Sequence, residues 1–154
     1  MKVLSESSSA LLDLPEAANE LHLPHGIIGF PQHRRAELLY AEENLPFLWM
    51  RLHGPDLLHF VMIEPADLFP GYEPEIFDED AASLGIVDPA DALILNIVTL
   101  KHGQRAGATV NLIGPLIVNR RTRIGRQRVL ANHTRYSAQH PLVDTTRAGV
   151  VART

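Results

Sequence analysis

The chain has 154 residues, of which 45% are hydrophobic and 21% are charged, and its formal net charge is -4 at pH 7. This composition excludes a disordered chain, which would need low hydrophobicity or a large net charge, and the length suits one globular domain. Cysteine is absent, which excludes disulfide bonds, thiolate metal sites and thiol nucleophiles and fits a reducing compartment.

The two ends of the chain give few structural signals. Residues 1–20 contain one lysine, four acidic residues and no apolar core of an export signal, so their structure is left uncertain. No later stretch approaches the roughly 18 apolar residues of a membrane span, and we expect a cytoplasmic protein. Residues 5–20 and 143–154 lack periodicity and are expected to be mobile ends, the latter a flexible tail.

Charge is distributed unevenly along the chain. Residues 1–51 carry four basic and seven acidic side chains, residues 52–100 carry none and ten, and residues 101–154 carry ten and one. Such separation produces either a dipolar surface that orients approaching partners or two halves that pair with each other. The sequence leaves both alternatives open.

The first half of the chain predicts short strands at residues 37–41, 47–53 and 57–63, the last two joined by a Gly-Pro-Asp turn. One short helix is predicted at residues 78–84. Asp78 is its expected N-cap, and Gly85 is suited to follow its last turn.

The second half predicts antiparallel β-structure. Residues 93–100 form a β-branched apolar run, typical of a strand buried on both faces. Two extended segments follow, at residues 108–113 and 116–119, and Gly114-Pro115 between them predicts a kink or bulge. A turn then leads into a further strand over residues 127–130, which pairs back as a hairpin.

Together these elements predict a mainly β fold: a single, compact antiparallel barrel or sandwich with one or two short helices.

Histidines and carboxylates are the first candidates for chemistry. His22 and His25 are separated by Pro24, and His53 and His59 are possible cross-strand neighbours without a third ligand, so no metal site is predicted. Glu73 and Glu75 lack a companion nucleophile, which favours a solvated acidic face over an acid and base pair. No glycine-rich loop suits a phosphate group. Neither a cofactor nor an enzyme activity is expected.

Five arginines between residues 120 and 128 supply the rival interpretation, an RNA-binding β-barrel that uses this hairpin. The stretch has no interleaved aromatic residues, and the chain is acidic as a whole. A solvated edge, or pairing of these arginines with acidic residues of the same chain, is therefore favoured.

Several phrases, in order, are similar to those of the FliW family of flagellar assembly factors. They are residues 26–31 (GIIGFP), 46–49 (PFLW), 60–65 (FVMIEP), 72–73 (YE), 109–119 (TVNLIGPLIVN), Gly125, Gln127, and 136–142 with its final Pro-Leu.

The resemblance implies a compact β-barrel-like domain over residues 21–142, without enzyme activity or cofactor. It also implies two partners, the translational repressor CsrA and newly made flagellin. Flagellin that accumulates would occupy this protein and leave CsrA free to repress flagellin translation. After flagellin export, the freed protein would sequester CsrA.

Because CsrA binds RNA and so presents a basic surface, the acidic, aromatic segment 64–80 is predicted to contact it. The alternative is that the aromatic residues belong to the core. The predicted contact residues are Glu64, Phe69, Tyr72, Glu73, Glu75, Phe77, Asp78 and Glu79. A structural role is predicted for Gly26, Gly29, Phe30, Asn111, Pro115 and Asn119, the two asparagines by bonding backbone groups near the kink.

Overall fold

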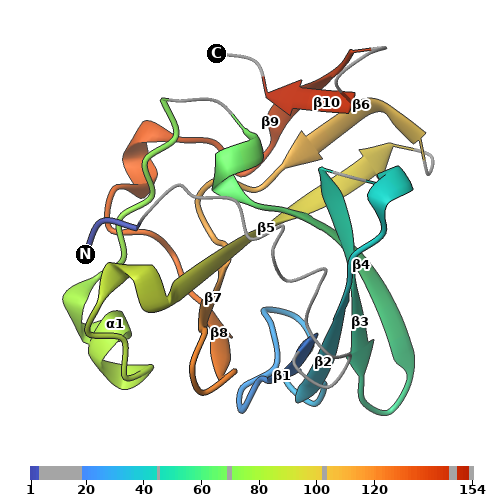
Figure 1. Cartoon of the computed structure of the whole chain (residues 1–154). Helices are drawn as coiled ribbons and strands as arrows, with labels where there is room; N and C mark the ends of the chain where they lie inside the picture. The colour runs from blue at the N-terminus through green and yellow to red at the C-terminus, as the bar shows by residue number, and fades with distance from the viewer. Residues whose placement is uncertain (4–18, 45, 69–70, 102–103, 146–148, 153–154) are drawn as a thin grey trace.

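The computed structural model describes residues 1–3, 19–44, 46–68, 71–101, 104–145 and 149–152, and Figure 1 shows the arrangement of their elements. No helix within these residues is long and apolar enough to cross a membrane. The strands are β1 (Glu20–His22), β2 (Arg35–Leu39), β3 (Phe47–His53), β4 (Leu57–Ile63), β5 (Ala92–Lys101), β6 (Gln104–Val110), β7 (Leu116–Asn119), β8 (Gly125–Gln127), β9 (His140–Thr145) and β10 (Gly149–Ala152). The helices of the described residues are α1 (Asp78–Ser83) and the 3-10 turns η3 (Glu42–Asn44), η4 (Pro65–Asp67), η5 (Pro89–Asp91) and η6 (His133–Arg135).

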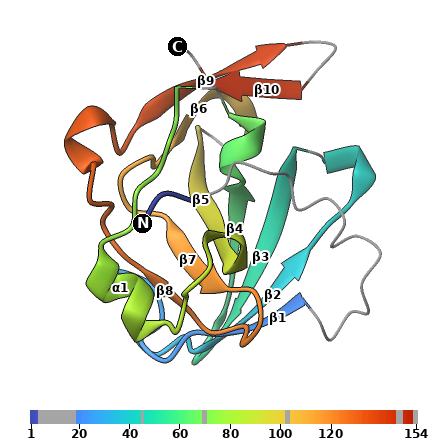
Figure 2. The ribbon, with the colours of Figure 1, turned by 60° about the vertical axis from the view of Figure 1, so that its left-hand side comes forward.

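All strand pairs are antiparallel, and the main path of the sheet runs β1, β2, β3, β4, β5, β6, β9, β10, with β7 attached to β5 and β8 to β7. The sheet curls on itself around the core (Figures 1 and 2). This arrangement confirms the predicted mainly β, barrel-like fold. The predicted boundaries of β3 and β4 are also correct, whereas β2 and β8 each begin two residues earlier than expected.

β5 is buried on both faces over its first half, as predicted. Leu93 and Leu95 pack with the apolar side chains of β1, β2 and β3, and Ile94 packs on the opposite face against Ala81 and Leu84. This second apolar contact fixes the end of α1 against the sheet.

The strand partner of β5 is interrupted between β6 and β7, at the predicted kink. Asn111 begins the interruption, and its Oδ1 accepts hydrogen bonds from the backbone N–H groups of Ile113 (3.1 Å) and Gly114 (3.0 Å). Pro115, which has no N–H, is buried before β7 resumes the pairing with β5. These contacts support the structural role expected for Asn111 and Pro115.

Replacing Asn111 with alanine is expected to lower the free energy of unfolding by about 1–3 kcal/mol, because two backbone donors lose their acceptor. Chemical denaturation measures the loss. Asn111→Asp is the matched control, because aspartate keeps the acceptor oxygens and should retain more of the stability. An Asn111→Ala variant as stable as the wild type would contradict the structural role.

Asn119, at the end of β7, is completely buried. Its Nδ2 donates to the backbone oxygen of Leu84 (2.9 Å), and its Oδ1 accepts from the N–H of Arg121 (2.9 Å) in the β7–β8 turn. One side chain thus joins the end of α1 to the hairpin, which supports its expected structural role.

The turn after β1 contains both glycines to which a structural role was assigned from the sequence. Gly26 has φ +62°, and a Cβ there would lie 2.0 Å from the backbone oxygen of Phe30, so only glycine fits. Gly29 has φ +92°, and the N–H of Phe30 donates to the oxygen of Ile27 (2.8 Å). Ile28 therefore stands at the exposed tip of a tight turn.

Two sequence expectations differ from the structure. The N-cap of α1 is Phe77, not Asp78, because Asp78 already has helical geometry and no side chain caps the helix. The segment 143–154 was expected to be a flexible tail, yet of its described residues 143–145 complete β9 and 149–152 form β10, and the two strands pair with each other. A short hairpin of this kind leaves little periodicity to detect.

Candidate partner-binding site

The predicted contact residues of segment 64–80 divide into buried and exposed groups. Only 4% of Glu64 and 1% of Tyr72 is exposed, so both lie in the interior, and their assignment to a partner contact is corrected. For Tyr72 the core alternative is the right one. Phe69 lies outside the described residues.

Tyr72 belongs to a buried polar network. Its hydroxyl donates to the backbone oxygen of Leu112 (2.8 Å) and accepts from Asn96 Nδ2 (2.8 Å), which also donates to the oxygen of Asn111 (3.0 Å). Burial raises the pKa of Tyr72, so the hydroxyl keeps the proton that it donates. The network ties the acidic segment to the β6–β7 kink. Its one visible sequence signal was Asn96, the single polar residue between Ala92 and Val98 in an apolar run.

The exposed part of the segment has a fixed backbone. Asn132 donates from Nδ2 to the oxygen of Glu73 (2.8 Å) and accepts at Oδ1 from the N–H of Glu75 (3.1 Å). The N–H of Glu73 also donates to the Tyr136 hydroxyl (2.9 Å). The carboxylate of Glu73 therefore extends into solvent from an anchored chain, and that of Glu75 is half-buried. Nothing in the sequence pattern marked Asn132 or Tyr136 as these anchors.

Helix α1 has one exposed and one buried side. Phe77 is 40% exposed, and Asp78 and Glu79 beside it are exposed as well. Asp80, in contrast, is buried and pairs with Arg128 Nε at 2.9 Å, which connects α1 to the segment after β8. Phe77 and its two acidic neighbours are consequently presented from a rigid base.

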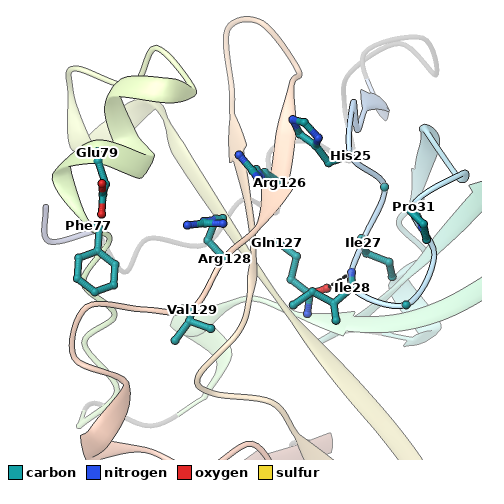
Figure 3. A pocket seen from close by; sticks show the side chains of 12 residues that line it. His25, Ile27, Ile28, Pro31, Phe77, Glu79, Arg126, Gln127, Arg128 and Val129 are labelled. Atoms are coloured by element: carbon teal, nitrogen blue, oxygen red, sulfur yellow. Dashed lines mark hydrogen bonds between the residues drawn. The ribbon is translucent and has the colours of Figure 1, made fainter.

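A cleft of about 440 Å³ lies between the start of α1, the turn 26–30 and residues 126–129 (Figure 3). Phe77 and Glu79 form its α1 wall, and Ile28 and Val129 add two further exposed apolar side chains. Gln127 connects the other two walls, because its Oε1 accepts from the N–H of Ile28 at 2.9 Å. The cleft unites segments about 100 residues apart in sequence, so no local pattern could predict it.

Within the described residues, no three or more histidine or carboxylate side chains lie together as potential metal ligands. His53 bonds to Glu37, and His33 to Asp56. His53 and His59, the possible cross-strand neighbours, are not directly opposite each other, because the register places His53 opposite Leu57 and His59 opposite Arg51. They occupy diagonal positions on one face of the β3–β4 pair.

The arginine-rich hairpin is partly neutralised by acidic residues of the middle third of the chain. Arg121 pairs with Asp91 at 3.2 Å, and Arg128 pairs with Asp80 at 2.9 Å. These contacts favour intramolecular pairing over a free phosphate-binding surface.

We therefore predict that the protein does not bind RNA. A gel shift in moderate salt should leave RNA unretarded, because two arginines are paired and aromatic stacking platforms are missing from residues 119–128. Tight, salt-sensitive retention that disappears on replacing Arg120, Arg121 and Arg123 would instead support the RNA-binding interpretation.

Comparisons with known proteins agree with this structure. The family described as FliW protein matches residues 8–142. The flagellar assembly factor FliW of Natranaerobius thermophilus is 38% identical over 119 residues, which are 77% of this chain and 78% of that protein. That of Desulfitobacterium hafniense strain Y51 is 34% identical over 148 residues, 96% and 95% of the two chains. A crystal structure of the flagellar assembly factor FliW superposes with a TM-score of 0.68 at 30% identity, covering 84% of this chain and 88% of the other. The chain therefore belongs to the FliW family of flagellar assembly factors.

Proposed function

We propose that this protein is a cytoplasmic partner switch that binds CsrA and flagellin. When flagellin is scarce, it sequesters CsrA and relieves repression of flagellin translation. When flagellin accumulates, flagellin occupies the protein and CsrA is released. The proposal adds to the family assignment the two partners that the sequence resemblance implies.

The observation that supports it most directly is the exposed acidic group around Phe77. Glu73, Asp78 and Glu79 are exposed on a backbone held by Asn132 and by the packing of α1. In the described residues Glu73 and Glu79 form no ion pair, and Asp78 pairs with the N-terminal ammonium group of Met1 at 3.3 Å. A protein that binds RNA presents basic surface, which such a group attracts and orients. Phe77 supplies apolar area that is already rigid and loses little entropy on contact.

The charge part of this proposal is tested by reversing Glu73 and Glu75 to lysine. The double variant should associate with CsrA more slowly, and its association rate should depend less on salt, because steering by opposite charges is reduced. Surface-immobilised CsrA and a series of salt concentrations give both quantities.

The matched control reverses Glu42 and Glu43, two exposed acids on η3, across the molecule from α1 (Figure 1). It changes the net charge equally and should alter association less. A folded Glu73 and Glu75 variant with wild-type kinetics throughout the salt series would place the CsrA contact elsewhere.

The switch itself is tested by competition. Flagellin added to a preformed complex with CsrA should release CsrA in proportion to the flagellin bound. Tagged protein purified from its own cells should carry both partners. If neither CsrA nor flagellin were recovered, the result would count against the proposed function as a whole.

A further inference from the structure

Within the part of the chain that the structure describes, the backbone of β8 and of the residues after it has one edge that no strand covers. The N–H of Arg128 donates to the oxygen of Pro115 (3.2 Å), and the N–H of Leu130 donates to the oxygen of Ile113 (2.9 Å). In an antiparallel ladder the residue between two such donors points its own N–H and C=O to the opposite side. Val129 therefore directs its backbone groups away from β7.

Gln127 has the same orientation, because it lies between Arg126, which faces Ile117 on β7, and Arg128. Among the described residues, β8 pairs with no strand other than β7. The free edge thus includes at least Gln127 and Val129, and both residues line the cleft (Figure 3).

The sequence explains why this edge stays open. Strand β1 begins to cover it, since the N–H of His22 donates to the oxygen of Arg123 (2.8 Å) in a parallel bridge. Two residues later Pro24 has no N–H to continue the ladder, and the chain turns away toward Gly26. The cleft begins where this pairing ends.

The walls of the cleft specify what could fill it. Ile28, Phe77 and Val129 are 67%, 40% and 44% exposed, which is unusual apolar exposure for one small surface. Arg126 and Glu79 stand on different walls, and neither forms an ion pair within the described part of the chain. The complementary ligand has an apolar side chain at its centre, a carboxylate for Arg126 and a cationic group for Glu79.

We propose that the cleft binds an extended peptide segment of another protein, which adds as a strand to the edge formed by Gln127 and Val129. Alternating backbone donors and acceptors match a polypeptide in this mode of recognition, and the flanking side chains select its sequence. Glu79 disfavours a polyanion such as RNA. The inference goes beyond the proposed function, because it does not require that the peptide belong to CsrA or to flagellin.

The test uses the full chain and a phage-displayed library of random 12-residue peptides. Selected peptides should share an apolar residue with an acidic neighbour. Val129→Pro, which removes an N–H that has no hydrogen-bond partner among the described residues, should weaken their binding about tenfold relative to Val129→Ala, which keeps the N–H. Both variants replace the isopropyl group of Val129, but only the proline removes the backbone N–H, and it also fixes φ.

Hydrogen exchange of the wild-type protein provides a readout that does not depend on how the proline variant folds. Without peptide, the amides of Gln127 and Val129 should exchange faster than those of Arg126 and Arg128. A selected peptide should slow the exchange of Gln127 and Val129 by about tenfold or more.

Three results would overturn the proposal. The library could yield no binder, or the binders could leave these two amides unprotected. Protection that appears without peptide and rises with protein concentration would assign the edge to a second copy of the chain.

Discussion

Replacing Tyr72 with alanine is expected to lower the free energy of unfolding by about 3–5 kcal/mol, which is a large part of the stability of a domain this size. The ring is 1% exposed and packs among the side chains of β6 and the residues that follow it, so its removal leaves a cavity. Tyr72→Phe keeps the ring but leaves the oxygen of Leu112 without its donor and removes one acceptor of Asn96. That variant should lose about 1–3 kcal/mol.

Phe77→Ala is the control for this series, since it removes an aromatic ring from the same segment at a position that is 40% exposed. Urea denaturation of the four proteins should rank them in the order wild type, Phe77→Ala, Tyr72→Phe, Tyr72→Ala. If Tyr72→Ala unfolded at the same urea concentration as the wild type, the assignment of Tyr72 to the core would be wrong. Tyr72 would then again be a candidate for the partner contact.

The sequence predicted those strands whose apolar pattern depends on nearby residues alone. β3, β4 and the first half of β5 are long runs that bury apolar side chains, and turn residues bound them clearly. The kink before β7 was equally visible, because Pro115 cannot donate to a ladder. By contrast, β8 was predicted with the wrong bounds, because Gly125–Gln127 is too short for a periodic signal to fix its ends, and β10, which in the described residues pairs with β9 alone, was missed.

The candidate site was less predictable, because it depends on which residues the fold brings together. Tyr72 and Phe77 occur in the same acidic, aromatic segment. Tyr72 forms hydrogen bonds with Asn96 and Leu112 in the interior. Phe77, in contrast, lies at the start of a helix whose other side is buried. The amino-acid composition of the segment does not distinguish the buried ring from the exposed one. Long-range contacts made by Asn132 fix the surrounding backbone, and no local pattern reveals them.

The uneven charge along the chain illustrates the same limit. The sequence left open whether the acidic and basic thirds pair or form separate surfaces, and the structure contains both situations. Asp80 and Asp91 pair with Arg128 and Arg121, while Glu79, next to Asp80 in sequence, faces the cleft without an ion pair in the described residues. Neighbouring acids thus differ in role because α1 turns one inward and one outward.

On the proposed function, Phe77→Ala should weaken CsrA binding by about 10- to 30-fold, chiefly through faster dissociation. An aromatic side chain on a rigid base is the kind of residue that dominates the affinity of an interface, whereas charge reversal acts mainly on association. Biolayer interferometry with immobilised CsrA separates the two rate constants.

Leu57→Ala is the matched control for this variant. Leu57 is 50% exposed, comparable to Phe77, but it starts β4, away from α1 (Figure 1). It should leave both rate constants nearly unchanged, because truncation of an apolar side chain matters only where a partner buries it. Equal effects of the two substitutions would indicate a general loss of stability. A folded Phe77→Ala variant with the wild-type dissociation rate would remove Phe77, and with it this side of the cleft, from the CsrA contact.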